Sequence, residues 1–256
     1  MKRILLAITA SIGLYALAAP PDNGKAPFAP AGEGSLLAVP DSTLMLGNLL
    51  RHVSAAELTA ALPAGKGDPT YGFSTSVSRE SGSLKLGMLM ADLKVAVTAA
   101  DSKRVQQTAV SLIGGFQATG APAGLAIAVS HTADVARSGD FDAVRKAAIP
   151  ILDQWLEAFV EAEGQLVHYR LGEWTESTLL ALTAAETAEL PSADLILGGL
   201  RTASVFLAEI GKDKAPPEGM AKALGTLAEL GAKAELDARD VKTARKALAD
   251  LAAFGG

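Results

Sequence analysis

The side chains that could do chemistry in this chain are three histidines and many carboxylates. The histidines are His52, His131 and His168, and there is no cysteine. A metal site in a helical bundle needs histidine and a carboxylate three or four positions apart, so that both reach one ion. His131 has Asp134 at that spacing, whereas the nearest acidic residues to His168 are five positions away. A single pair is better explained as a solvated helix face, and we predict no metal site.

Motifs for nucleophilic catalysis and for phosphate binding are also missing. There is no Gly-x-Ser-x-Gly elbow, and Ser130-His131 is not a dyad because neighbours on a helix point about 100° apart. Gly114-Gly115 and Gly198-Gly199 end apolar helical stripes and do not follow a strand, as Walker and Rossmann motifs require. We interpret these glycine pairs as places where another helix packs closely, and predict no bound cofactor.

Clustered carboxylates are the remaining catalytic candidates. Glu157, Glu161 and Glu163 precede a turn, and Glu173 and Glu176 follow it. Two facing carboxylates can hydrolyse glycosides, but such enzymes also present aromatic platforms. Only 5% of this chain is aromatic. A solvated acidic face is the better explanation, so we predict no catalytic residue.

One segment, 164–174, is the best candidate for a binding surface. It holds His168, Tyr169, Arg170 and Trp174, and residues of these types are favoured where proteins make contacts. The competing interpretation is that Trp174 is a core residue in the first turn of the next helix, and it is the more economical one.

The elements that must position these residues are helices. Alanine, the strongest helix former, is abundant, and apolar residues recur at helical spacing from Leu86 onward. Ser83 is the expected cap of the first long helix, and Asp140 that of the fourth. Pro150 should kink this fourth helix because it cannot donate to the carbonyl one turn back.

The two halves of the helical region resemble each other. Lys85-Leu86-Gly87 matches Arg170-Leu171-Gly172, and residues 96–101 match 181–186, both 85 positions apart. Residues 140–147 match 240–247, which places an insertion near Glu209–Gly219. This pattern favours an internal duplication. We therefore predict an all-α helical bundle of about eight long helices in two related four-helix units, 84–163 and 166–256, that form one compact domain.

The N-terminus has the pattern of an export signal. Lys2 and Arg3 precede about 16 apolar positions, short of the roughly 20 that a membrane anchor needs, and Ala16-Leu17-Ala18 fits signal peptidase. We predict a signal peptide over 1–18, a proline- and glycine-rich tether over 19–34, and short helices with a long loop over 35–83. Without cysteine the protein is not a lipoprotein, and we expect it in the periplasm or secreted, with no transmembrane segment after cleavage.

Charge narrows the range of partners. Of 23 basic residues, 21 remain after loss of Lys2 and Arg3, against 28 acidic ones, for a formal charge of −7. This balance argues against nucleic acid as a partner. We expect a non-enzymatic binding or scaffold protein of the cell envelope, whose partner is another envelope protein or a hydrophobic small molecule. A carrier that holds such a molecule or a lipid between the two units is the first alternative, favoured by the wide apolar stripe over 144–160. An enzyme of unrecognised type is the second.

Overall fold

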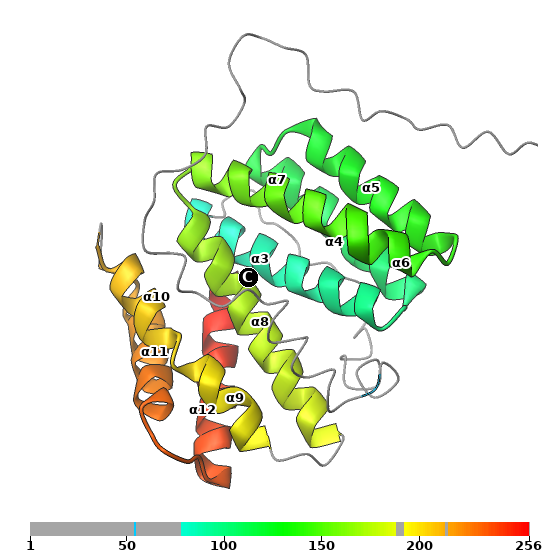
Figure 1. Ribbon diagram of the computed structural model, residues 1–256. Coiled ribbons are helices and arrows are strands. Elements are labelled where there is room, and N and C mark those ends of the chain that lie inside the picture. Colours follow the sequence, from blue (N-terminus) through cyan, green and yellow to red (C-terminus); the bar gives the residue numbers. More distant parts are fainter. Residues whose placement is uncertain (1–53, 55–77, 188–191, 213–214, 256) are drawn as a thin grey trace, which may run out of the picture. The chain divides into compact units, whose positions relative to one another are not determined.

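The computed structural model describes residues 54, 78–187, 192–212 and 215–255, and their regular structure is helical with no strand in these ranges (Figure 1). The all-α prediction is confirmed for this part of the chain. The signal peptide, the tether and nearly all of 35–77 lie outside the described residues. Among the helices that the structure does describe, none has the length and apolar character needed to cross a membrane.

The first half of the described chain runs from α3 to α7. Its helices are α3 (Arg79–Thr98), α4 (Ser102–Thr119), α5 (Ala123–Arg137), the short α6 (Phe141–Ala143) and α7 (Ile149–Ala162). Asp140 caps α6 as predicted and Asp101 caps α4, each accepting a backbone N–H three residues on. The cap of α3 is Ser78, whose hydroxyl accepts from the amide of Ser81, so the helix begins before the predicted Ser83.

Pro150 is accommodated by a local widening of the helix. A π-helical turn, η2 (Val144–Ala148), joins α6 to α7, and the amide of Ile149 bonds back to the carbonyl of Val144. Pro150 follows directly and has no N–H to donate one turn back. A π turn shifts the bonding pattern by one residue, and so adapts the helix to the residue that cannot take part.

The second half contains one more helix, among the described residues, than the predicted four. It comprises α8 (Leu166–Thr187), α9 (Ser192–Leu200), α10 (Ala203–Ile210), α11 (Glu218–Gly231) and α12 (Ala238–Ala252), then the 3₁₀ turn η3 (Ala253–Gly255). The additional break is a turn at Arg201 and Thr202, between α9 and α10. The predicted insertion falls between α10 and α11. Asp237 caps α12 in a capping box with Asp240.

The buried apolar residues form two cores. One core gathers side chains of α3–α7, and the other gathers side chains of α8–α12, while α8 contacts both groups of helices (Figure 1). Two fully buried residues each belong to a helix of one half and pack in the core of the other half. Leu84 of α3 belongs to the core of the second half, and Tyr169 of α8 belongs to the core of the first. Each half therefore contributes a fully buried side chain to the core of the other, and the partly buried Met88 and Leu166 pack across in the same way.

The closest approach between α3 and α8 lies at two glycines. A Cβ on Gly87 would overlap the carbonyl oxygen of Tyr169 and lie 2.9 Å from the backbone nitrogen of Glu173. A Cβ on Gly172 would overlap the carbonyl oxygen of Leu84. Only glycine therefore fits at either position.

The glycine pairs singled out in the sequence behave differently. Gly114 and Gly198 have open space where a Cβ would stand, so neither admits a neighbouring helix. The prediction that they are packing positions is wrong for these two residues. A glycine at the end of an apolar stripe can face away from the stripe's partner, and spacing alone does not show which side it faces.

Candidate functional site

The predicted histidine–carboxylate pair lies on an exposed face of α5. His131 and Asp134 are both exposed, and the carboxylate of Asp134 pairs with Arg137 at 2.7 Å. Within the described residues, no group of three or more histidine and acidic side chains is placed to hold a metal ion. His52 lies outside them. Asp134 therefore forms a solvent-exposed ion pair with Arg137, one turn further along α5, and not a metal site with His131.

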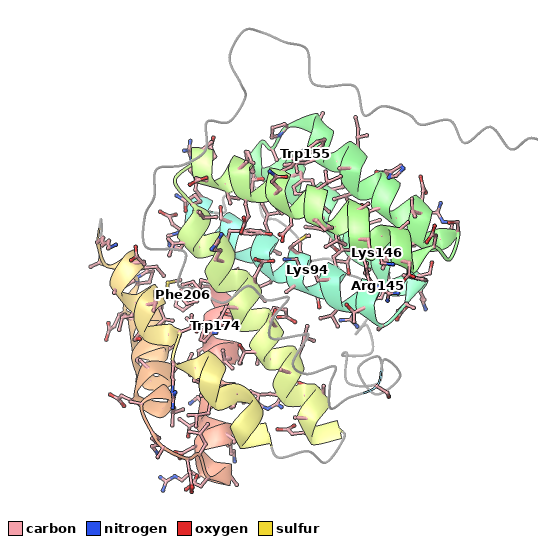
Figure 2. All side chains as sticks on the ribbon, viewed as in Figure 1. Lys94, Arg145, Lys146, Trp155, Trp174 and Phe206 are labelled. Atoms are coloured by element: carbon pink, nitrogen blue, oxygen red, sulfur yellow. The ribbon has the colours of Figure 1, made fainter. Side chains whose placement is uncertain are left out.

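Two of the four predicted surface residues are buried in different cores. Tyr169 is fully buried, and its hydroxyl donates to Asp153 Oδ1 at 3.0 Å. Trp174 is buried as the ninth residue of α8, where its indole N–H donates to the carbonyl of Gly199 at 3.1 Å. Its ring centroid lies 5.4 Å from that of Phe206 (Figure 2). Both aromatic residues hold the helices together and are not available on the surface.

The other two predicted residues are partly exposed and have separate surroundings. The guanidinium of Arg170 pairs with Glu157 of α7, with Nη2 3.0 Å from Oε1. His168 lines a pocket described below. The four residues therefore do not form one surface, because consecutive residues of a helix point to different sides of it.

A buried ion cluster joins α3, α7 and α8. The ammonium of Lys94 lies 2.7 Å from Asp153 Oδ2 and 2.7 Å from Glu173 Oε1, and the side chains of Lys94 and Glu173 are only 5% and 7% exposed. Burial lowers the pKa of Lys94, but the charges of the two carboxylates outweigh it and hold that pKa above its usual value. A lysine that stays protonated cannot serve as a nucleophile or base. The cluster is structural.

A second ionisable cluster lies where α3, α4 and α8 meet. Asp92 Oδ1 is 3.4 Å from Arg104 Nη2, and burial raises the pKa of Asp92 although Arg104 opposes the shift. Burial and the charge of Asp92 raise the pKa of Glu176 to about 8. Asp92, Glu176 and Lys85 line a cavity of about 20 Å³. This space admits about one water molecule and no organic substrate.

Lys94 and Asp92 are not among the residues whose types and spacing suggested a site in the sequence. The signal that could have found them is their position, because both charges interrupt the apolar run from Leu86 to Val97. A charged residue on the buried side of a helix needs a partner, and the partner marks a helix packed against it.

Residues of both halves line one pocket, which we call the junction pocket. It has a volume of about 480 Å³ and is formed by the start of α3, the turn between α7 and α8, the segment from α10 to α11, and η3. Its apolar wall consists of Val167, Ile210, Ala215, Pro216, Pro217, Met220 and Phe254. Its polar side chains are Ser78, Glu80, Ser81, Gln165, His168 and Glu209.

Two buried polar atoms of residues that line the junction pocket lack a hydrogen-bond partner in the described structure. They are Gln165 Oε1 and His168 Nδ1. Burial lowers the pKa of His168, with Glu80 opposing the shift, so its imidazole is neutral at pH 7. Buried polar atoms are nearly always bonded, and each exception asks for an explanation such as a ligand or a water.

A second hollow lies along α11 and α12. It has a volume of about 500 Å³ and is lined by exposed Lys222 and Lys246 and by Thr226, Thr243 and Phe254 among others. Both threonine hydroxyls already bond to carbonyls of their own helices. Unlike the junction pocket, its lining includes no unpartnered buried atom among the described residues.

Comparison with family models, with curated proteins and with solved structures found no match.

Proposed function

We propose that this chain is an exported, non-enzymatic protein of the cell envelope that binds a small molecule with an apolar body in the junction pocket. The observation that carries the proposal is a 480 Å³ pocket with a mainly apolar wall and two unpartnered polar atoms in its lining residues. The proposed extracytoplasmic location is supported by the signal-peptide pattern of residues 1–18.

The pocket has the properties of small-molecule sites. Such sites have volumes of roughly 300–1,000 Å³, an apolar lining and a few placed polar groups. The junction pocket lies within this range, and its lining combines a mainly apolar wall with a few polar side chains. Its wall comes from α3 of the first half and from α10 and α11 of the second, which agrees with the expected carrier that holds its ligand between two units.

The ionisable clusters support a non-enzymatic role. Lys94 is held protonated by two carboxylates, and the cavity beside Asp92 and Glu176 has room for about one water molecule. A pocket that holds groups with mutually shifted pKa values would favour an enzyme. Asp92 and Glu176 are such a pair, but the cavity that they line is too small for a substrate.

We further propose that the two halves arose by duplication. Leu84 and Tyr169, the two exchanged core residues, are 85 positions apart, as are Gly87 and Gly172. A two-fold relation between the halves accounts for this reciprocity. Duplication also explains why a pocket occurs at the junction, since two units that meet along α3 and α8 leave a recess beside the contact.

Native mass spectrometry of protein recovered from the extracytoplasmic fraction tests the proposal. We expect one small molecule bound per chain, and we expect its loss in Ile210→Trp, which fills the pocket. Ile127→Trp is the matched control, because Ile127 is 68% exposed on α5 and does not line the pocket. Equal adducts on both variants would place the ligand elsewhere. A bare chain that also fails to bind octan-1-ol would contradict the proposal.

A further inference from the structure

Two large apolar side chains are buried without belonging to either core. Val95 of α3 is 0% exposed and Leu180 of α8 is 3% exposed. Neither of the two cores that the described residues form includes them. A buried apolar side chain touches several other residues, so part of what covers these two lies elsewhere in the chain.

The two residues hold equivalent positions on their helices. Val95 lies eight residues after Gly87, and Leu180 lies eight residues after Gly172. Eight residues of helix rise about 12 Å, so each side chain lies about two turns past the closest approach of α3 and α8. The two residues therefore mark a face that both halves build beside the crossing.

Small side chains complete this face, which we call the flanking face. Ala91 lies one turn before Val95, and Ala181 and Ala184 lie beside Leu180 on α8. The three alanines are 0%, 5% and 0% exposed and belong to neither core. Because the distance between packed helices depends on the side chains at their contact, alanines let a covering helix approach closely.

The segment 36–53 has the apolar residues to cover the flanking face. Four of them recur at the spacing i, i+3, i+4, i+7 of one helical face, namely Leu46, Leu49, Leu50 and Val53. The positions that alternate with them are polar, at Asn48, Arg51 and His52. This pattern predicts an amphipathic helix with one side to bury.

Other stretches outside the described residues fit the flanking face less well. The segments 188–191 and 213–214 together contain one large apolar residue, Leu190, and both 19–34 and 63–77 are rich in proline and glycine. The chain from 54 to 77 is also long enough to return to the face. Fully extended, it spans up to about 80 Å, whereas Val95 lies about 26 Å along α3 from Ser78.

These observations together point to one occupant. We propose that residues 36–53 of this chain pack on the flanking face through Leu46, Leu49, Leu50 and Val53. In this position the segment contacts α3 of the first half and α8 of the second, and so stabilises their crossing. The folded domain of the mature protein then begins near residue 36. This inference does not depend on the proposed ligand.

Photo-cross-linking of the mature protein tests which surface the segment covers. We expect p-benzoylphenylalanine at position 49 to link within the same chain to residues 91–98 of α3 or 177–185 of α8, as mapped by peptide mass spectrometry. The same amino acid at position 25, in the predicted tether, is the matched control and should not prefer these ranges. Links from position 49 to other helices, links between two copies of the chain, or no link at all overturn the inference.

Amide hydrogen exchange gives a second measurement. Leu49→Ser combined with Leu50→Ser removes the apolar contact, so we expect the amides of 91–98 and 177–185 to exchange about tenfold faster, while those of α11 stay unchanged. Arg51→Ser combined with His52→Ser, on the polar side of the same segment, is the matched control. Leu50→Ala takes the place of the first variant if that variant does not fold. Equal exchange in the apolar and polar variants contradicts the proposal.

Discussion

Gly87 of α3 and Gly172 of α8 each pack against the backbone of the other helix at an equivalent position. A Cβ on the first would overlap the carbonyl oxygen three residues before the second, and a Cβ on the second would overlap the carbonyl oxygen three residues before the first. The next contacts agree, at 2.9 Å from the nitrogen of Glu173 and 3.1 Å from that of Met88. The crossing of α3 and α8 is thus symmetric at the level of single backbone atoms, and it brings the two halves together.

Alanine at either glycine should disrupt this crossing. Gly87→Ala and Gly172→Ala each place a methyl group against backbone, which no rotamer change can relieve, so we expect each to cost about 3 kcal/mol or more of unfolding free energy. Urea denaturation measures the loss. Gly114→Ala and Gly198→Ala are the controls, because both positions are open. We expect these to be neutral or to gain up to about 1 kcal/mol. If the control variants lost as much unfolding free energy as Gly87→Ala and Gly172→Ala, the result would argue against a close backbone contact at the α3–α8 crossing.

Removal of the buried Lys94 should leave the carboxylates of Asp153 and Glu173 without a counter-charge. We expect Lys94→Met to cost about 3–5 kcal/mol, because Glu173 and Asp153 lose their counter-charge. Glu173→Gln added to Lys94→Met should recover part of this cost in the same urea experiment. The raised pKa means that the lysine's contribution is complete below its unfolded pKa near 10.5 and is lost only at higher pH. If the double variant lost as much unfolding free energy as Lys94→Met alone, or more, the result would contradict a structural role for the ion cluster.

Glu176 should make stability depend on pH. Its pKa rises from 4.5 to about 8 in the fold, so its contribution is fully present below pH 4.5 and is lost as pH rises to about 8. We expect Glu176→Gln to match the wild-type protein near pH 4.5 and to exceed it by about 4 kcal/mol at pH 8.5. Thermal unfolding across this range measures the difference, with Glu229→Gln as the control. Parallel pH profiles for the wild-type protein and Glu176→Gln would show that Glu176 is not protonated in the fold.

The local features of the fold could be predicted from the sequence. Helical periodicity and polar caps are set within one or two turns, and Asp140 caps a helix where expected. Ser83 was the wrong cap because the apolar stripe of α3 starts later than the helix itself, whose first turn is exposed. The break after Leu200 was missed because no proline marks it.

The candidate site was harder to predict because it is tertiary. The junction pocket combines residues near positions 80, 165, 210 and 254, and only His168 among them was nominated. Tyr169 and Trp174 are types favoured at contacts, but in this fold they face two cores. Sequence spacing does not show which side of α8 meets which half.

Export can be tested independently of the fold. We expect the chain, expressed with its own N-terminus, to be recovered outside the cytoplasm with Ala19 as its first residue. Ala18→Glu should block cleavage, since signal peptidase requires a small residue there. Intact mass and N-terminal sequencing distinguish the two forms. If the wild-type chain stayed in the cytoplasm and kept Met1–Ala18, the result would contradict the predicted export.

The most direct test of the central claim, that the junction pocket is the binding site, is a methyl NMR titration of the mature protein with octan-1-ol. We predict saturable shifts at the methyl groups of Val167, Ile210 and Met220, with no change at exposed Val110 and Ile127. Shifts that instead centre on Ala223 and Thr226, beside the hollow between α11 and α12, or no saturable shift at all, would contradict it.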